Sequence, residues 1–182
     1  MARDLAARNH RVTAVDTSRT LLRYARQADS LGSYALADSA TLPFFDESFD
    51  LAIAYNALQV VTDMPGTVKE TYRVLRRGGH LCVCVSHPVT DLGQFTGDDR
   101  DAAFAIRQPY FGTQRVEDTV EIDGQTMTFR GWSYTLEDYA RAFENAGFRI
   151  EALREPRPSG ASQRYDKWKR IPLFLNVRAI KL

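Results

Sequence analysis

The feature that most constrains the fold is a repeated alternation of short apolar runs with amphipathic, helix-like segments. Four runs rich in β-branched and other apolar residues predict strands, at residues 11–15, 33–37, 50–55 and 80–86. Amphipathic segments at 17–32 and 65–79 predict helices, the second ended by Gly78-Gly79. This order predicts an α/β fold with a doubly wound, mostly parallel sheet, right-handed crossovers and helices on both faces.

The second half of the chain departs from this alternation. Residues 88–134 form a long polar insert, in which Asp123-Gly124 predicts a β-hairpin that lies over the carboxyl edge of the sheet. A capped helix is then expected at 135–146, and strands at 148–153 and 171–180 close the sheet as an antiparallel pair. We therefore predict a single domain over residues 1–182, with 88–134 as an inserted cap.

Composition excludes several classes of partner. The 182 residues are 44% hydrophobic and 26% charged with a net charge of +1, which gives no reason to expect nucleic acid or an anionic membrane. No apolar run approaches the roughly 20 residues of a membrane span, and no signal peptide opens the chain. Cys82 and Cys84 have no second cysteine pair or nearby histidines, so we expect them to be buried, with no metal site and a cytoplasmic location.

Polar residues follow the ends of the predicted strands. Asp16, Asp38 and Asn56 follow the first three strands, and His87 follows the fourth. Ligands of open α/β sheets bind at the carboxyl edge, so we expect these residues to cluster there.

Four stretches carry a resemblance to a known family: "HRVTAVDTS", "ADSATLPFFDESFDLAIAYNAL", "ETYRVLRRGGHLCVCVSHP" and "TLEDYARAFENAGF". Together the sequence resembles the class I S-adenosylmethionine-dependent methyltransferases, and is similar to the small-molecule enzymes of the ubiquinone/menaquinone-biosynthesis type. The resemblance implies a Rossmann-like methyltransferase fold, S-adenosylmethionine as cofactor, and transfer of a methyl group to a small-molecule acceptor.

The resemblance also implies roles for individual residues. Asp16 corresponds to the acid that binds the ribose hydroxyls, and a cap of the following helix is the alternative interpretation. Asp38 corresponds to the acid that binds the adenine amino group, and Ser39 offers a backbone N–H to the ring. Asn56, with Ala57 beside it, lies where the methionine part is expected, and a loop-capping role is the alternative for Asn56.

His87 is the candidate catalytic residue. It stands at the carboxyl edge, whereas His10 and His80 lie at strand entrances on the opposite edge. An unperturbed histidine has a pKa suited to taking a proton from the acceptor. The alternatives are that His87 lines the substrate pocket, or that it is an orienting residue bonded to the backbone.

Aromatic residues of the inserted segment are candidates for the substrate pocket. Tyr110, Trp132 and Tyr134 could form an apolar lid that excludes water and orients the acceptor. Alternatively, these rings form the small core of the cap itself.

One family element is missing from the sequence. In the family a first strand and a glycine-rich turn precede the helix that "ARDLAARNH" represents, and neither is present here. We expect two unpaired strand edges as a result, between the strands that end at Asp16 and Asn56. A fragment or misplaced start, an evolutionary loss, and a partner chain that fills the gap are the three explanations.

Two other functions stay open. A non-catalytic binding or oligomerisation module would explain the missing turn. A nicotinamide-dependent oxidoreductase would also place an acid after the second strand of the fold, but Asp38 and the final antiparallel strands oppose it. A small-molecule acceptor and a homodimer are the expected partners.

Overall fold

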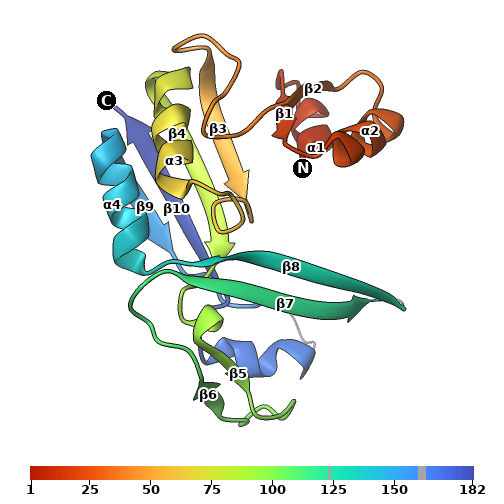
Figure 1. Cartoon of the computed structure of the whole chain (residues 1–182), viewed down its shortest axis with the longest axis vertical. Coiled ribbons are helices and arrows are strands. Elements are labelled where there is room, and N and C mark those ends of the chain that lie inside the picture. Colours follow the sequence, from red (N-terminus) through yellow and green to blue (C-terminus); the bar gives the residue numbers. More distant parts are fainter. Residues whose placement is uncertain (123, 160–162) are drawn as a thin grey trace.

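The computed structural model describes residues 1–122, 124–159 and 163–182. Its first unit contains α1 (Ala2–Ala6), β1 (Thr13–Asp16), α2 (Arg19–Ala28) and β2 (Ser33–Leu36), in which β1 and β2 pair in parallel. The second unit is a four-stranded sheet of order β3-β4-β10-β9, formed by β3 (Phe49–Tyr55), β4 (Leu75–Ser86), β10 (Phe174–Lys181) and β9 (Phe148–Arg154). Figure 1 shows the first unit standing beside β3.

The sheet is divided between β1 and β3. Within the described residues β1 pairs only with β2, and β3 only with β4, so no ladder joins the two units. The expected pair of free strand edges is confirmed, because β1 and β3 each leave one edge without a strand partner. No described strand lies between β1 and β3.

The four-stranded sheet has the predicted directions. β3 and β4 are parallel, while β10 is antiparallel to both β4 and β9. Its core forms against α3 (Met64–Val74) and α4 (Leu136–Ala146), where Val68, Val85 and Phe143 are almost fully buried. Thr135 and Asp138 make the predicted capping box, and Gly147 ends α4 in the left-handed conformation.

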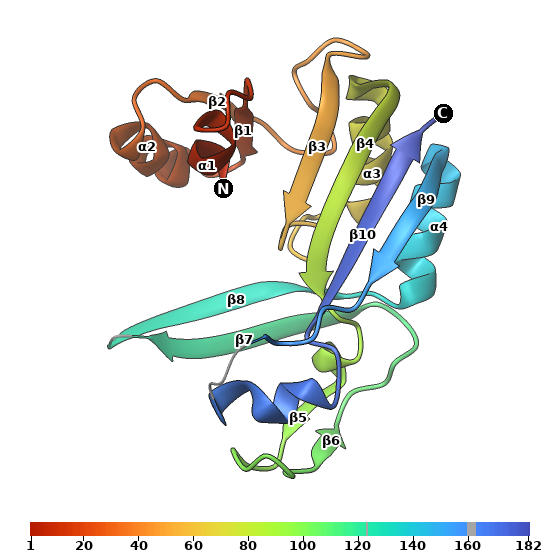
Figure 2. The same cartoon turned by 180° about the vertical axis from the view of Figure 1, so that it is seen from behind.

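Helices cover only one face of this sheet, contrary to the prediction of two covered faces. Figure 2 shows the other face without a helix across it. On β3 the side chains of Leu51, Ile53 and Tyr55 are 45%, 38% and 55% exposed. The helix predicted at residues 1–10 does not cover them, because α1 has only five residues, none of them buried, and stays with the first unit.

The boundary between α3 and β4 also differs from the prediction. The helix ends at Val74, and Gly78-Gly79 lie inside β4 instead of ending the helix. Pairing with β3 shifts here, since Phe49 faces Leu75 whereas Leu51 faces His80. A bulge explains both glycines, because Gly78 has a φ of +74° and a Cβ at Gly79 would lie 2.8 Å from the Arg76 carbonyl oxygen.

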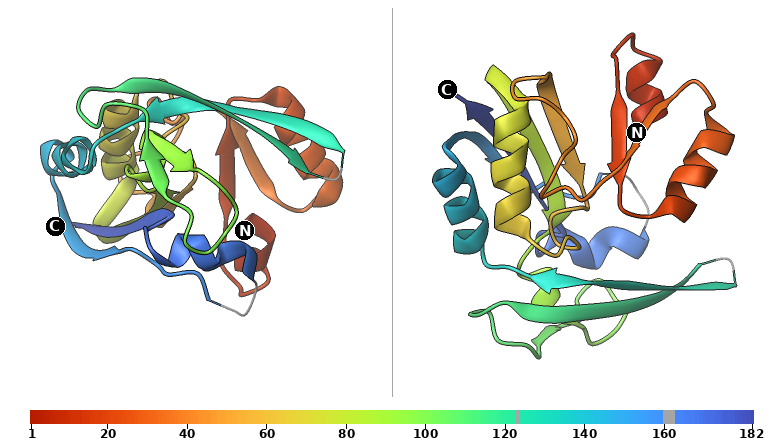
Figure 3. Two further views of the ribbon diagram at one scale, coloured as in Figure 1. Left: turned by 90° about the horizontal axis from the view of Figure 1, so that it is seen from below. Right: turned by 45° about the horizontal axis from the view of Figure 1, so that its top comes forward.

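The inserted segment contains two small antiparallel sheets. The short helix η1 (Thr90–Leu92) leads into the first sheet, in which β5 (Gly93–Phe95) pairs with β6 (Phe104–Ile106). In the second sheet β7 (Gln114–Ile122) pairs with β8 (Gln125–Ser133). The predicted turn residue Asp123 lies outside the described residues, while Gly124 has the positive φ of +75° that such a turn needs. Figures 1 and 3 show β7 and β8 crossing the ends at which β3 and β4 stop.

The short helix η2 (Gln163–Lys169) precedes β10. None of the helices in the described ranges is long and apolar enough to cross a lipid bilayer.

One arginine connects the loop between β2 and β3 to α3. The Arg73 guanidinium bonds both carboxylate oxygens of Glu70 at 2.9 and 2.7 Å, and donates to the carbonyl oxygens of Leu42 and Phe44. It also donates to the Asp46 carboxylate at 2.6 Å. Bidentate and charge-assisted bonds of this kind fix geometry, so Arg73 holds the loop that links the two units.

We expect Arg73→Lys to lower the midpoint of thermal unfolding by roughly 2–8 °C, because an ammonium group cannot reproduce the planar set of contacts. Arg76→Met is the matched control, since Arg76 is exposed and its single ion pair with Asp50 spans 3.9 Å. Equal shifts in the two variants would show that the loop is held by something other than Arg73.

Hydrogen exchange should report the division of the sheet. We expect backbone amides of β1 and β2 to exchange at least about 100-fold faster than those of β4 and β10, which have strand partners on both sides. Mass spectrometry of exchanged peptides can measure this. Uniform protection of β1 and β4 would contradict the separation into two units.

Candidate functional site

Asp16 and Asp38 lie at the same edge of the first unit. β1 and β2 run parallel, and the Ala37 N–H donates to the Asp16 carbonyl oxygen at 3.2 Å. Asp16 accepts the Ser18 N–H on Oδ1 at 2.7 Å, while the hydroxyl of Ser18 caps α2. Asp16 is therefore not the helix cap, and within the described residues its second carboxylate oxygen has no hydrogen bond.

The segment after β2 is turned back toward α3. Asp38 is exposed and accepts the Ala40 N–H at 2.9 Å. The Ser39 hydroxyl hydrogen-bonds with the hydroxyl of buried Thr67 on α3 at 2.9 Å. Because the Ser39 hydroxyl is hydrogen-bonded to Thr67, a ligand contact by Ser39 would use its backbone, which is the role that the resemblance implies.

Asn56 makes the turn that leaves β3. It is exposed and has a φ of +49°, in the left-handed region that asparagine tolerates better than most residues. Its N–H donates to the Cys84 carbonyl oxygen at 2.7 Å, and the Ala57 carbonyl oxygen accepts from Val60 and Val61. The exit from β3 is thus a defined turn that displays the Asn56 side chain.

His87 is buried, and both ring nitrogens are engaged. Nδ1 accepts the Val89 N–H at 3.1 Å, so the proton lies on Nε2, which is 3.0 Å from a Glu155 carboxylate oxygen. Burial lowers the pKa of His87, and the nearby Glu155 carboxylate offsets part of that effect. In this arrangement neither nitrogen is free to take a proton, and the geometry favours the orienting role over the catalytic one.

The predicted pocket aromatics take separate positions. The backbone N–H of Trp132 donates to the Gln59 carbonyl oxygen at 2.7 Å, which fixes β8 to the turn after β3. Tyr134 instead packs edge-to-face on Tyr139 and joins the core, while the Tyr110 hydroxyl accepts the N–H of Leu136 at the start of α4. Only Trp132 is thereby brought next to the turn that contains Asn56.

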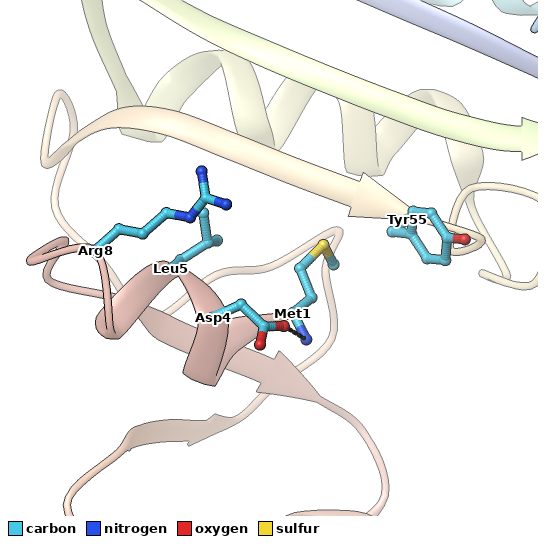
Figure 4. A pocket seen from close by; sticks show the side chains of 5 residues that line it. All are labelled: Met1, Asp4, Leu5, Arg8 and Tyr55. Carbon is cyan, nitrogen blue, oxygen red and sulfur yellow. Dashed lines mark ion pairs between the residues drawn. The ribbon is translucent and has the colours of Figure 1, made fainter.

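A cavity of about 480 Å³ lies between α1 and β3, lined by Met1, Asp4, Leu5, Arg8 and Tyr55. Figure 4 shows the Met1 amino group paired with Asp4, and the arrows of β3 and of the neighbouring red strand pointing the same way. None of the predicted site residues lines this cavity. It lies along the free edge of β3 instead.

Sequence reasoning missed Asp91, which lies in η1 after the carboxyl end of β4. Burial raises the pKa of this carboxyl to about 6. Asp91 is thus a titratable group after the carboxyl end of β4, as His87 is. Burial, with a smaller contribution from the charge of Asp91, raises the pKa of Tyr139.

Asp91→Asn should stabilise the protein at pH 8. The pKa of Asp91 is higher in the folded than in the unfolded state, so its stabilising contribution is full below about pH 4 and is lost as the pH rises through 6. We expect the variant to exceed the wild type by on the order of 1–3 kcal/mol at pH 8, with the difference shrinking toward pH 4. Urea unfolding at both pH values measures this, and a constant difference would contradict it.

Comparison with known proteins supports the resemblance. Residues 1–83 match the family described as "Methyltransferase domain". The malonyl-[acyl-carrier protein] O-methyltransferase of Salmonella typhimurium is 39% identical over 79 residues, which are 43% of this chain and 32% of that protein. A chloroplastic 2-methyl-6-phytyl-1,4-hydroquinone methyltransferase of Oryza sativa is 33% identical over 90 residues, 48% of this chain and 26% of that protein.

The chain thus spans about a third or less of the length of these curated relatives. Among solved structures, an S-adenosylmethionine dependent methyltransferase from Mesorhizobium loti has a TM-score of 0.72 and 26% identity. The match covers 93% of this chain and 80% of that one. By sequence over residues 1–83 and by fold over nearly its whole length, the chain is similar to S-adenosylmethionine-dependent methyltransferases.

Proposed function

We propose that this protein transfers a methyl group from S-adenosylmethionine to a nucleophilic atom of a small molecule. The observation that carries the proposal is the placement of Asp16, Asp38 and Asn56. Each follows the carboxyl end of a strand of the α/β fold, at the edge where open sheets bind their ligands.

The residues present fit the cofactor. One oxygen of Asp16 is left for the ribose hydroxyls, exposed Asp38 is available to the adenine amino group, and the Ser39 N–H to the ring. Asn56 and Ala57 are assigned to the methionine part. When bound, the cofactor supplies the methyl group: a lone pair of the acceptor bonds the methyl carbon as the carbon–sulfur electron pair moves to sulfur, and the acceptor proton passes to water.

The acceptor is assigned only by class. The family match ends at residue 83, before the segment 88–134 that we propose as the substrate cap of a single domain. The names of the relatives therefore carry no acceptor over to this chain. His87 and the aromatics Tyr110, Trp132 and Tyr134 remain candidates for lining the pocket, with His87 in an orienting role.

The free edges of β1 and β3 favour a second candidate function, a binding or oligomerisation module without catalysis. We propose instead that one further strand, parallel to both, lies between them in the active protein. Its glycine-rich turn would add backbone donors to the cofactor site. Without about three such bonds, the affinity for S-adenosylmethionine would fall on the order of 100- to 1000-fold.

Asp16→Asn should weaken S-adenosylhomocysteine binding by roughly 10- to 100-fold, because it removes charge-assisted bonds to the ribose. Calorimetric titration up to millimolar ligand measures this in the 182-residue chain. The control is Asp29→Asn, since Asp29 is an acid at the other end of the same unit that accepts the Leu31 N–H. Equal affinities for wild type and Asp16→Asn would refute the ribose assignment. Absence of binding both in this chain and in one that also carries the further strand would favour the non-catalytic module.

A further inference from the structure

His87 is the residue at which the chain leaves β4 and enters the inserted segment. Its N–H donates to the Leu173 carbonyl oxygen, just before β10, at 2.9 Å. Its carbonyl oxygen accepts both the N–H and the hydroxyl of Thr90, at 2.8 and 2.7 Å. The backbone of His87 therefore connects the four-stranded sheet to the first residue of η1.

The short helix η1 in turn holds the sheet of β5 and β6. The carbonyl oxygen of buried Leu92, at the end of η1, accepts the N–H groups of Arg107 and Gln108 at 2.7 and 2.9 Å. Both residues directly follow β6. A change in the position of η1 is therefore passed to this small sheet.

The imidazole ring of His87 secures the same turn. Nδ1 accepts the Val89 N–H at 3.1 Å, and Nε2 lies 3.0 Å from a Glu155 carboxylate oxygen. Only the neutral ring with its proton on Nε2 makes both bonds, because a nitrogen that carries a proton cannot accept. A second proton, on Nδ1, would set two N–H groups against each other. Turning the ring over does not relieve this conflict, since it places carbon atoms at both partners.

Glu155 is the charged group that faces the ring from the segment after β9. Its side chain is half exposed, and within the described residues no Lys or Arg forms an ion pair with it. Arg154 beside it donates to the Leu153 carbonyl oxygen instead. Burial lowers the pKa of His87, and Glu155 offsets only part of that effect, so the ring is neutral near pH 7.

The other elements at this end of β4 bring no further charge into contact with the ring. The segment before β10 contributes the uncharged Leu173 carbonyl group. Asp91 of η1 and Tyr139 of α4 also titrate, and among the described residues neither is hydrogen-bonded to His87. A proton that binds Nδ1 thus meets the Val89 N–H and no acceptor.

We propose that His87 is a pH-sensitive switch that holds the start of the inserted segment. When Nδ1 takes up a proton, the Val89 N–H is released, and η1 loosens from the end of β4 together with the sheet of β5 and β6. The proposal concerns this hinge alone and does not depend on the proposed function.

The direction of the pH effect follows from the two states of the hinge. In the open hinge His87 has the ordinary histidine pKa of about 6.5, whereas the closed hinge lowers that pKa. The contribution of His87 to the closed hinge is therefore fully present above about pH 6.5 and is lost as the pH falls below that value. At about pH 5 the open population should be roughly 5- to 30-fold larger than at neutral pH.

Hydrogen exchange of the 182-residue chain measures the open population. Peptides that contain Val89 and Thr90 are compared at about pH 7.5 and pH 5, after correction for the chemical exchange rate. We expect their protection to fall roughly 5- to 30-fold at the lower pH, while β4 and β10 stay protected.

Two substitutions separate the roles of the ring nitrogens. His87→Asn keeps an oxygen that can accept the N–H two residues on and does not titrate, so protection should be equal at both pH values. His87→Gln keeps an N–H for Glu155 but lacks that acceptor, so exchange should be fast at both. His80→Asn is the matched control, because His80 also lies in β4 and pairs with a carboxylate, that of Glu151. It should respond as the wild type does.

Two further variants exclude the carboxyl groups. Glu155→Gln leaves an acceptor for Nε2 and removes the charge that favours the protonated ring, so the fall in protection should be at least as large as in the wild type. Asp91 has a raised pKa in the folded protein, so acid stabilises the closed hinge through this group. Asp91→Asn should therefore keep or enlarge the fall.

Equal protection of the wild type at both pH values would overturn the proposal. A fall of wild-type size in His87→Asn, or its disappearance in Glu155→Gln or Asp91→Asn, would do the same. Where loss of protection in β4 and β10 shows that His87→Asn does not fold, the two carboxyl variants decide. No arm uses S-adenosylmethionine, so failure of methyl transfer leaves this proposal standing, and its own failure leaves the proposed function standing.

Discussion

The Glu70–Arg73 pair on α3 is the interaction on which the arrangement of this protein depends. The two units share no strand ladder, so the loop between β2 and β3 is their main connection. Arg73 bonds two carbonyl oxygens of that loop and the Asp46 carboxylate, while Glu70 accepts the Leu42 N–H and holds the guanidinium. Because Arg73 strengthens the ionised form of Glu70, the pKa of that carboxyl lies below its usual value. Asp38 follows β2 on one side of this connection and Asn56 follows β3 on the other, so their relative position depends on it.

A second contact places the cap. The hairpin of β7 and β8 contacts the turn after β3 through the backbone N–H of Trp132. The approach is this close because Gly131 has no side chain. The residues that we assign to the cofactor come from the α/β units, and the acceptor side that we propose lies where the hairpin touches the turn. The family match ends at residue 83, before the segment that we propose as the cap.

Much of the fold could be predicted because its signals are local. Thr135, Asp138 and Gly147 set the limits of α4 through contacts within a few residues, and apolar runs marked each strand of the two units. The polar residues after the strands could be placed at one edge for the same reason. The glycines at 78 and 79 misled the prediction, because a glycine pair also suits a bulge, and only pairing with β3 distinguishes the two.

By itself the sequence determined the order of strands and helices, the caps of α4, and the resemblance to a methyltransferase family. Only the tertiary structure decided that helices cover one face of the four-stranded sheet, that His87 is bonded at both nitrogens, and that Gln59 Oε1 lacks a hydrogen-bond partner among the described residues. The physical reason is separation along the chain. Val89 is close to His87 in sequence, but Glu155 lies 68 residues away. The backbone carbonyl oxygen of Gln59 likewise accepts from the backbone N–H of Trp132 on β8. Hydrogen-bond satisfaction of a buried group depends on which distant segments arrive beside it, and no local pattern of residues encodes that.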